Sequence, residues 1–108
     1  MRRGDVVTVS APDDYGKPRP AVVIQSNELQ GTDSVLLCLI TTAERDASFF
    51  RVPIAPTAGN GLLQPSNIMV DKIVTMRRDR CGSVIGRVDQ PTLLVLNRTL
   101  ALVLGIAD

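Results

Sequence analysis

The sequence is first notable for what it lacks: it has no histidine, no tryptophan, one tyrosine and two phenylalanines. Without histidine, no side chain ordinarily titrates near neutral pH, which removes the usual general base from any reaction. So few aromatic residues cannot build an extended platform on which the bases of a single strand stack. Any chemistry must therefore depend on other groups, and any nucleic-acid site must be small.

The two cysteines and the small net charge also limit the kinds of site that the chain can form. Two cysteines make neither a disulfide framework nor a CxxC motif, and Cys38, inside an apolar run, is interpreted as a small buried hydrophobic residue. With no histidine and two stray thiols, the chain offers few zinc ligands, so we expect no metal and no cofactor. The net charge is only +1, so a nucleic-acid site would have to be a local basic surface.

Long hydrophobic runs are also missing. No apolar stretch approaches the roughly 20 residues that a membrane-spanning helix requires, and residues 2–4 lead directly into a strand-like segment without a signal peptide. The chain has 108 residues, of which 44% are hydrophobic and 21% charged, an ordinary globular balance. We expect one domain, residues 1–108, in a soluble cytoplasmic protein with no membrane partner.

The hydrophobic pattern predicts several short strands followed by a single helix. Pro53 favours an edge position for its strand, and Gly86 suggests a bulge or a close backbone approach. Asp89 and Pro91 are typical of a helix start, and Gly105 of a helix end. The predicted fold class is a mostly β barrel with a C-terminal helix. We expect strands over residues 5–10, 19–26, 34–42, 49–54, 66–76 and 83–88, with the third central, and a helix over 92–104.

Several segments, taken in order, resemble the MazF/PemK family. The chain opens with MRRGDVVTV and continues with GKPRPAVVIQS, a strand ending in LITT, the segment GLLQPSNIMVDKIVTM, and IGRV before a helix ending in LGI. In that family a loop ends in Arg-Pro before an apolar strand, here Arg19 and Pro20. A later strand ends in threonine, here Thr41 or Thr42. The ordered set, which spans essentially the whole chain, carries the resemblance.

The resemblance implies a small SH3-like barrel of the CcdB/PemK type that forms a symmetric homodimer. It implies the toxin of a type II toxin–antitoxin system: a metal-independent, ribosome-independent endoribonuclease, or mRNA interferase, that cleaves single-stranded RNA at a short sequence. It also implies a cognate antitoxin, partly disordered, as the inhibiting partner. RNA supplies its own nucleophile, the 2′-OH, so the expected products are a 2′,3′-cyclic phosphate and a 5′-OH.

Arg19 is the leading catalytic candidate, because a guanidinium at the junction of a polar loop and a buried strand can meet phosphate charge. Its alternative is a surface arginine paired with Asp13 or Asp14. Thr41 best matches the catalytic threonine of the family, and Thr42 is a candidate RNA-binding residue beside it. Their alternative is the ordinary preference of threonine for strands.

Further RNA-binding candidates are Tyr15, Lys17, Pro20 and Asp71. Tyr15 could stack one base and Lys17 could touch a phosphate, although both could equally be solvated loop residues. Asp71 could instead be an outward-facing charge paired with Lys72 or an arginine. Family members that use this acid for chemistry have an arginine two residues earlier and a histidine in the first loop. Here Met69 stands in the first of those places and no histidine exists, so the general base is not identified.

Three further points concern other parts of the chain and the function as a whole. Arg77, Arg78 and Arg80 form a basic run that is either a solvated turn or a surface for RNA or an acidic antitoxin segment. Val74 stands where many members have a basic residue, which weakens one expected RNA contact. The main functional alternative is a non-enzymatic CcdB-like toxin that poisons a protein partner such as DNA gyrase. The terminal helix lacks the aromatic residue that those toxins use.

Overall fold

The computed structural model describes residues 1–10, 17–42 and 48–107, which form six strands and one long helix. A 3-10 turn, η2 (Arg78–Arg80), joins the last two strands, and α1 (Gln90–Val103) follows them. The predicted fold class, mostly β with a terminal helix, is therefore confirmed. The strands are β1 (Asp5–Val9), β2 (Arg19–Val23), β3 (Ser34–Thr41), β4 (Arg51–Ile54), β5 (Ser66–Arg77) and β6 (Cys81–Arg87).

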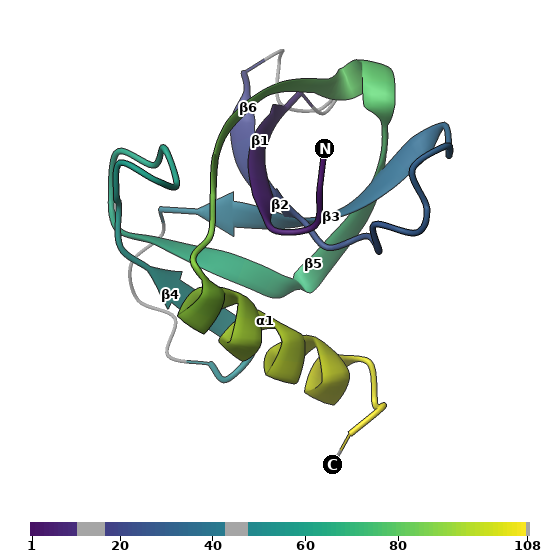
Figure 1. The fold of residues 1–108 in the computed structure, drawn as a ribbon. Coiled ribbons are helices and arrows are strands. Elements are labelled where there is room, and N and C mark those ends of the chain that lie inside the picture. Colours follow the sequence, from purple (N-terminus) through teal and green to yellow (C-terminus); the bar gives the residue numbers. More distant parts are fainter. Residues whose placement is uncertain (11–16, 43–47, 108) are drawn as a thin grey trace.

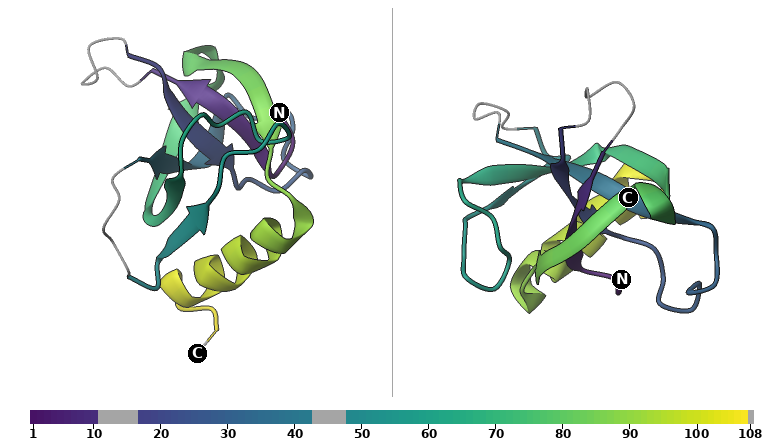
Figure 2. Two further views of the ribbon diagram at one scale, coloured as in Figure 1. Left: turned by 90° about the vertical axis from the view of Figure 1, so that its left-hand side faces the viewer. Right: turned by 90° about the horizontal axis from the view of Figure 1, so that it is seen from above.

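The six strands form one antiparallel sheet in the order β4-β5-β3-β2-β1-β6. The sheet curls into a barrel-like shape, and α1 lies beneath β4 and the first half of β5 (Figure 1). Two further views show that the helix crosses one side of the sheet (Figure 2). As predicted, β3 is an inner strand and β4, which contains Pro53, is an edge strand. An edge position suits proline because it has no amide proton to donate to a neighbour.

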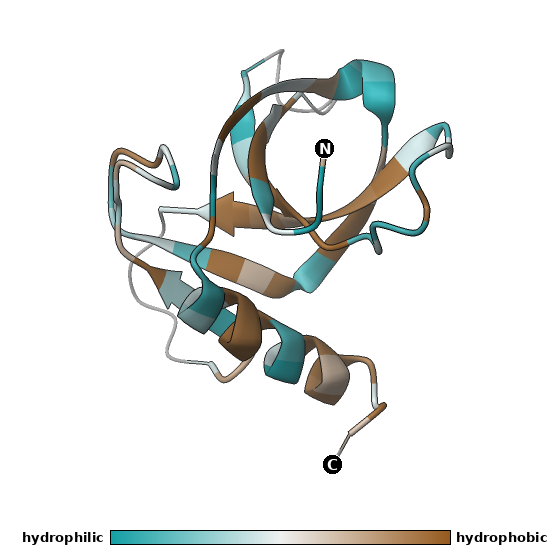
Figure 3. Ribbon diagram, viewed as in Figure 1, coloured by the Kyte–Doolittle hydropathy of each residue, from teal (hydrophilic) through white to brown (hydrophobic). Residues whose placement is uncertain are grey.

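The central strands are buried on both faces, because alternate side chains enter two different cores. Val6, Val22 and Cys38 belong to one core, which Leu96 and Leu100 of α1 complete. The second core lies on the opposite face and consists of Val7, Val9, Ala21, Val23, Val35 and Leu37. Figure 3 shows both sets as hydrophobic strand segments, with hydrophilic residues collected at η2. This double burial explains the continuous apolar runs in the sequence of β2 and β3.

Two irregularities shape the sheet around its rim. Between β1 and β6 the register shifts, so that Ile85 is left over between Val84 and Gly86. A Cβ at Gly86 would overlap the backbone of Gly59 and Asn60, and both readings of Gly86, a bulge and a close approach, are confirmed. Gly61 has φ +71°, and a Cβ there would overlap the Ile85 carbonyl. Glycine at these positions lets the segment before β5 pack directly on β6.

The ends of α1 also follow the sequence signals. The Asp89 carboxylate accepts a hydrogen bond of 2.9 Å from the Thr92 amide, as an N-cap residue does. At the other end Gly105 has φ +72°, and the amides of Gly105 and Ile106 donate to the carbonyls of Leu102 and Ala101. The helix begins two residues earlier than predicted, at Gln90 rather than at residue 92. No helix within the described residues is long and apolar enough to cross a membrane.

Candidate active site

Arg19 is the first residue of β2 and its side chain is exposed. It stands between Pro18 and Pro20, so the backbone on both sides has little freedom. Its register partner is Val9 of β1, which is almost completely buried. The sequence therefore fixes a guanidinium at the rim of the barrel on a short, rigid segment, with a packed strand directly behind it.

Thr41 is the last residue of β3 and is half-buried. β2 and β3 pair antiparallel with Ala21 opposite Leu39, and the same register extended by two residues brings Arg19 opposite Thr41. Because both lie two residues from one cross-strand pair, their side chains leave the sheet on the same face. The register thus brings together the two predicted catalytic residues, which are separated by a long stretch of sequence.

Asn67 of β5 completes this row, because it is the register partner of Thr41. The row then runs across β2, β3 and β5 as a guanidinium, a hydroxyl and an amide. Sequence reasoning missed Asn67, since a single polar residue near the start of a strand carries no distinguishing signal. Only the pairing of β3 with β5 identifies it as a neighbour of Thr41.

Asp71 lies further along β5 and is engaged with β4. Its Oδ1 is 3.3 Å from Nε of Arg51, whose side chain is only 14% exposed, against 32% for Asp71. The Arg51 guanidinium also lies over the Phe50 ring, 5.7 Å from the ring centre. The reading of Asp71 as a charge paired with an arginine is therefore confirmed, while its role toward RNA stays a prediction.

Arg51 was not among the candidate residues identified from the sequence. It lies on β4, and its register partner on β5 is Met69, the position at which the resemblance implies an arginine in some family members. The guanidinium on this part of the sheet thus comes from the neighbouring strand β4. Its burial, its ion pair and its ring contact suit a positioned group better than a solvated one.

The basic run at η2 is largely occupied by internal bonds. Arg78 donates from its guanidinium to the Thr32 and Leu29 carbonyls and to the Thr32 hydroxyl, which holds the loop between β2 and β3. Arg77 pairs with Asp79 at 2.7 Å. These contacts give Arg77 and Arg78 structural roles in the turn, while the reading of the run as a surface for RNA or an acidic antitoxin segment stays a prediction. Arg80 is exposed beside them.

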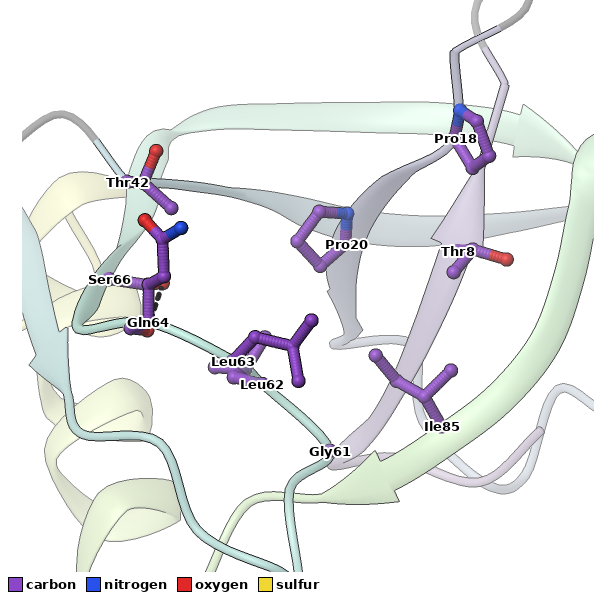
Figure 4. Close-up of a pocket in the computed structure, with 10 residues that line it drawn as sticks. All are labelled: Thr8, Pro18, Pro20, Thr42, Gly61, Leu62, Leu63, Gln64, Ser66 and Ile85. Carbon is purple, nitrogen blue, oxygen red and sulfur yellow. Dashed lines mark hydrogen bonds between the residues drawn. The ribbon is translucent and has the colours of Figure 1, made fainter.

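The remaining RNA-binding candidates gather near the same rim, apart from Tyr15, which lies outside the described residues. Lys17 is exposed and directly precedes Pro18. Pro20 and Thr42 both line a cavity of about 250 Å³ (Figure 4). In that view Thr42, Gln64 and Ser66 stand on one side, Thr8 and Ile85 on the other, and Leu63 between them. The cavity therefore adjoins both Arg19 and Thr41, through their neighbours in the chain.

The row of Arg19, Thr41 and Asn67 can bind an anion and stabilise added negative charge. Phosphate fits a guanidinium fork, and hydroxyl and amide groups supply further donors. Neither cysteine suits a nucleophile: burial raises the pKa of Cys38 to about 12, and burial also raises the pKa of Cys81. Among the described residues no group of three or more acidic or cysteine side chains could hold a metal ion.

Comparisons with known proteins agree on one family. Residues 2–104 match the model of the PemK-like, MazF-like toxins of type II toxin–antitoxin systems. The chain is 39% identical to a probable endoribonuclease MazF of Mycolicibacterium smegmatis, over 99% of both chains. A mycobacterial endoribonuclease solved in complex with its cognate antitoxin has the same fold, with a TM-score of 0.84 and 24% identity over 100% of this chain and 98% of that one. MazF in a MazE–MazF structure from Deinococcus radiodurans gives a TM-score of 0.79 and 19% identity, over 99% and 97%.

Proposed function

Since the chain belongs to the PemK-like, MazF-like toxins of type II toxin–antitoxin systems, we propose that it is a metal-independent endoribonuclease that cleaves single-stranded RNA at a short sequence. The observation that carries this proposal is the register that brings Arg19 opposite Thr41 on one face at the barrel rim. Cellular RNA lies in the cytoplasm, which is where we expect the toxin to act.

The proposed reaction uses the nucleophile of the RNA itself. The 2′-oxygen attacks the adjacent phosphorus and the bond to the 5′-oxygen breaks, which leaves a 2′,3′-cyclic phosphate and a 5′-OH. The 2′-OH gives up its proton and the leaving oxygen gains one. Arg19 meets the charge that grows on the phosphate oxygens and donates a hydrogen bond to the leaving oxygen, and Thr41 fixes the phosphate. Lys17, Thr42 and Asp71 would hold the flanking nucleotides.

The proposal includes a homodimer. On α1, Leu96 and Leu100 are buried against the sheet, but five apolar residues at the helix and just beyond it remain exposed in the single chain: Leu94 at 61%, Val95 at 45%, Leu102 at 39%, Leu104 at 56% and Ile106 at 77%. So wide an apolar surface on a domain of this size favours association. A twofold dimer would cover it with the same surface of a second copy.

We further propose that the cognate antitoxin inhibits by occupying the surface that would bind RNA, around Lys17 and Arg19. The family is defined by such a partner, and an acidic disordered segment would meet the same cations as RNA, Lys17 and Arg19. Its ordering on binding would reduce the net affinity for each unit of buried area. RNA and antitoxin should then compete, and independent binding of both would exclude this mode of inhibition.

The test is cleavage of total RNA and of a defined single strand by the purified chain in EDTA, with analysis of the product ends. Discrete products that carry a cyclic phosphate and a 5′-OH would support the proposal. A chain that leaves RNA intact but arrests DNA gyrase would instead be the non-enzymatic CcdB-like toxin. No feature of the described site favours that alternative.

A further inference from the structure

The cavity beside Arg19 and Thr41 is lined mainly by apolar residues, which binding a phosphate would not require. The apolar residues include Pro18, Pro20, Leu62, Leu63 and Ile85, while Gln64 and three hydroxyl residues bring polar groups to it. It holds about 250 Å³, whereas an apolar cavity of about 150 Å³ is enough for one benzene ring. A cavity of this volume can hold one planar heteroaromatic ring.

We propose that this cavity receives one nucleobase of the RNA next to the cleaved bond, and that Gln64 reads the edge of that base. The inference rests on the proposed endoribonuclease function and adds to it a residue that determines sequence specificity. Single-stranded RNA is commonly recognised by splaying a base out of the strand into such a site, where side chains contact its face and its edge.

Charge supports a base of RNA as the occupant. Along residues 17–20 two exposed cations, Lys17 and Arg19, alternate with two prolines that line the cavity. A strand whose phosphates follow the cations would bring a base to the prolines. None of the described residues that line the cavity is acidic, so none of them repels the phosphate backbone.

Gln64 is suited to reading a base edge because its side-chain amide is uncommitted. Among the described residues no hydrogen bond involves that amide, while the Ser66 hydroxyl is already bonded at 2.8 Å to the Gln64 backbone carbonyl. The Gln64 amide points toward Thr42 (Figure 4). An amide presents a donor and an acceptor side by side, which matches a base that offers an adjacent acceptor and donor.

Gln64→Leu tests the reading of the base, because leucine has nearly the same size and cannot form the hydrogen bonds. Cleavage of an RNA library randomised around the cut site gives the base preference at each position. The variant should lose preference at one position flanking the cut by roughly 5-fold or more and keep the others. Gln30→Leu, in the loop at the other end of β2 and β3, should cut like the wild type.

A second variant reports on binding without cleavage. The chain has no tryptophan, so Leu63→Trp places a single fluorophore at the cavity, where Leu63 is 92% exposed. A strand with a 2′-deoxy nucleotide at the cut site cannot react, and it should quench this fluorophore only when the preferred base is present. If the wild type cleaves no RNA but Leu63→Trp shows this quenching, the proposed endoribonuclease activity is contradicted and the proposed base site is supported.

Three results would overturn the base site. One is an unchanged base preference in Gln64→Leu, and another is fluorescence of Leu63→Trp that does not respond to RNA. The third is fluorescence that shifts with protein concentration alone, which would mean that a second copy of the chain covers the cavity.

Discussion

At the scale of single residues, the candidate site depends on groups whose charge does not vary near neutral pH. The row combines the cationic guanidinium of Arg19 with the uncharged side chains of Thr41 and Asn67. Such a site stabilises the negative charge that develops on the phosphate of the reacting RNA. The group that accepts the proton of the 2′-OH lies outside this row. This is consistent with a chain that contains no histidine.

Thr41 offers a graded test of this interpretation. Thr41→Ala should lower the single-turnover rate of RNA cleavage by about 10-fold or more, because a hydroxyl that binds the phosphate is lost. Thr41→Ser should retain more activity than Thr41→Ala, because the hydroxyl remains. Equal activity of the two variants would show that the hydroxyl is not used and that Thr41 is only a strand residue.

The two thiols should differ in reactivity. Burial raises the pKa of Cys38 from 9.0 to about 12, so the folded protein should protect it from an aromatic disulfide reagent until denaturant is added. Cys81 is only partly buried, and burial raises its pKa while Arg78 opposes the rise. Cys81 should therefore react in the native protein, but more slowly than a free thiol. Rapid native labelling of both cysteines would contradict the packing of β3.

The raised pKa of Cys38 also has a consequence for stability. The neutral thiol is the form that the core accepts, so its contribution is complete below pH 9 and is lost as the pH rises toward about 12. Urea unfolding should therefore show a steeper loss of stability over this range in the wild type than in Cys38→Ala. Parallel curves would mean that Cys38 is not buried.

At the scale of elements, hydrophobic periodicity and capping signals predicted the ends of an element correctly where those ends depend on the local sequence alone. Asp89, Pro91 and Gly105 marked the helix, and Pro53 marked an edge strand, because capping and missing amide donors are local effects. β2 ends earlier than predicted, at Val23, because the Gln25 side chain accepts from the Leu36 amide and donates to the Leu29 carbonyl. β6 begins earlier, at Cys81, because Cys81 already pairs with Val9.

What the sequence could not predict is register. β5 pairs with β4 over Ser66–Met69 and with β3 at Asn67 and Ile68, and after an irregularity in the register it pairs with β3 again from Ile73 to Arg77. This offset makes Asn67 a neighbour of Thr41 and Arg51 a partner of Asp71. Both relations depend on contacts between distant segments, so hydrophobic periodicity within one segment carries no information about them.

The cap of α1 makes a prediction at this scale. Hydrogen bonds from Thr92, through its side chain and its backbone, lower the pKa of Asp89. A lowered carboxylate pKa stabilises the fold above the ordinary pKa of the group, and the contribution disappears as the pH falls through the folded value. Asp89→Ala should thus lower the melting temperature at neutral pH, and the difference from wild type should shrink as the pH falls below the ordinary carboxyl pKa of 3.8.

Melting curves followed by circular dichroism at neutral pH and at a pH below the ordinary carboxyl pKa measure this effect. Asp33→Ala, which removes an exposed loop carboxylate, is the matched control and should melt like the wild type. Asp89→Asn should keep most of the stability, since asparagine also accepts from the Thr92 amide. A difference between Asp89→Ala and wild type that does not depend on pH would contradict the role of the charge.

At the scale of the whole molecule, the account predicts a homodimer that uses the exposed apolar side of α1. Light scattering at micromolar concentration should give about twice the chain mass of 11.6 kDa. Leu104→Asp should shift the protein toward monomer, because Leu104 is 56% exposed and would bring an unpaired charge into the interface. Gln30→Asp, a charge added far from the helix, should not. A wild-type monomer at this concentration would count against the dimer.

The most direct test of the central claim is single-turnover cleavage of a fluorogenic RNA by Arg19→Ala in EDTA, with circular dichroism to confirm folding. Removing a preorganised donor to the developing charge should lower the rate by about 10²–10³ or more. Arg19→Lys should restore it only in part, because an ammonium lacks the two-pronged geometry of the guanidinium. Asp71→Ala should cost less than Arg19→Ala, since Asp71 is bound to Arg51. A folded Arg19→Ala that cleaves RNA at the wild-type rate would contradict the assignment of this site.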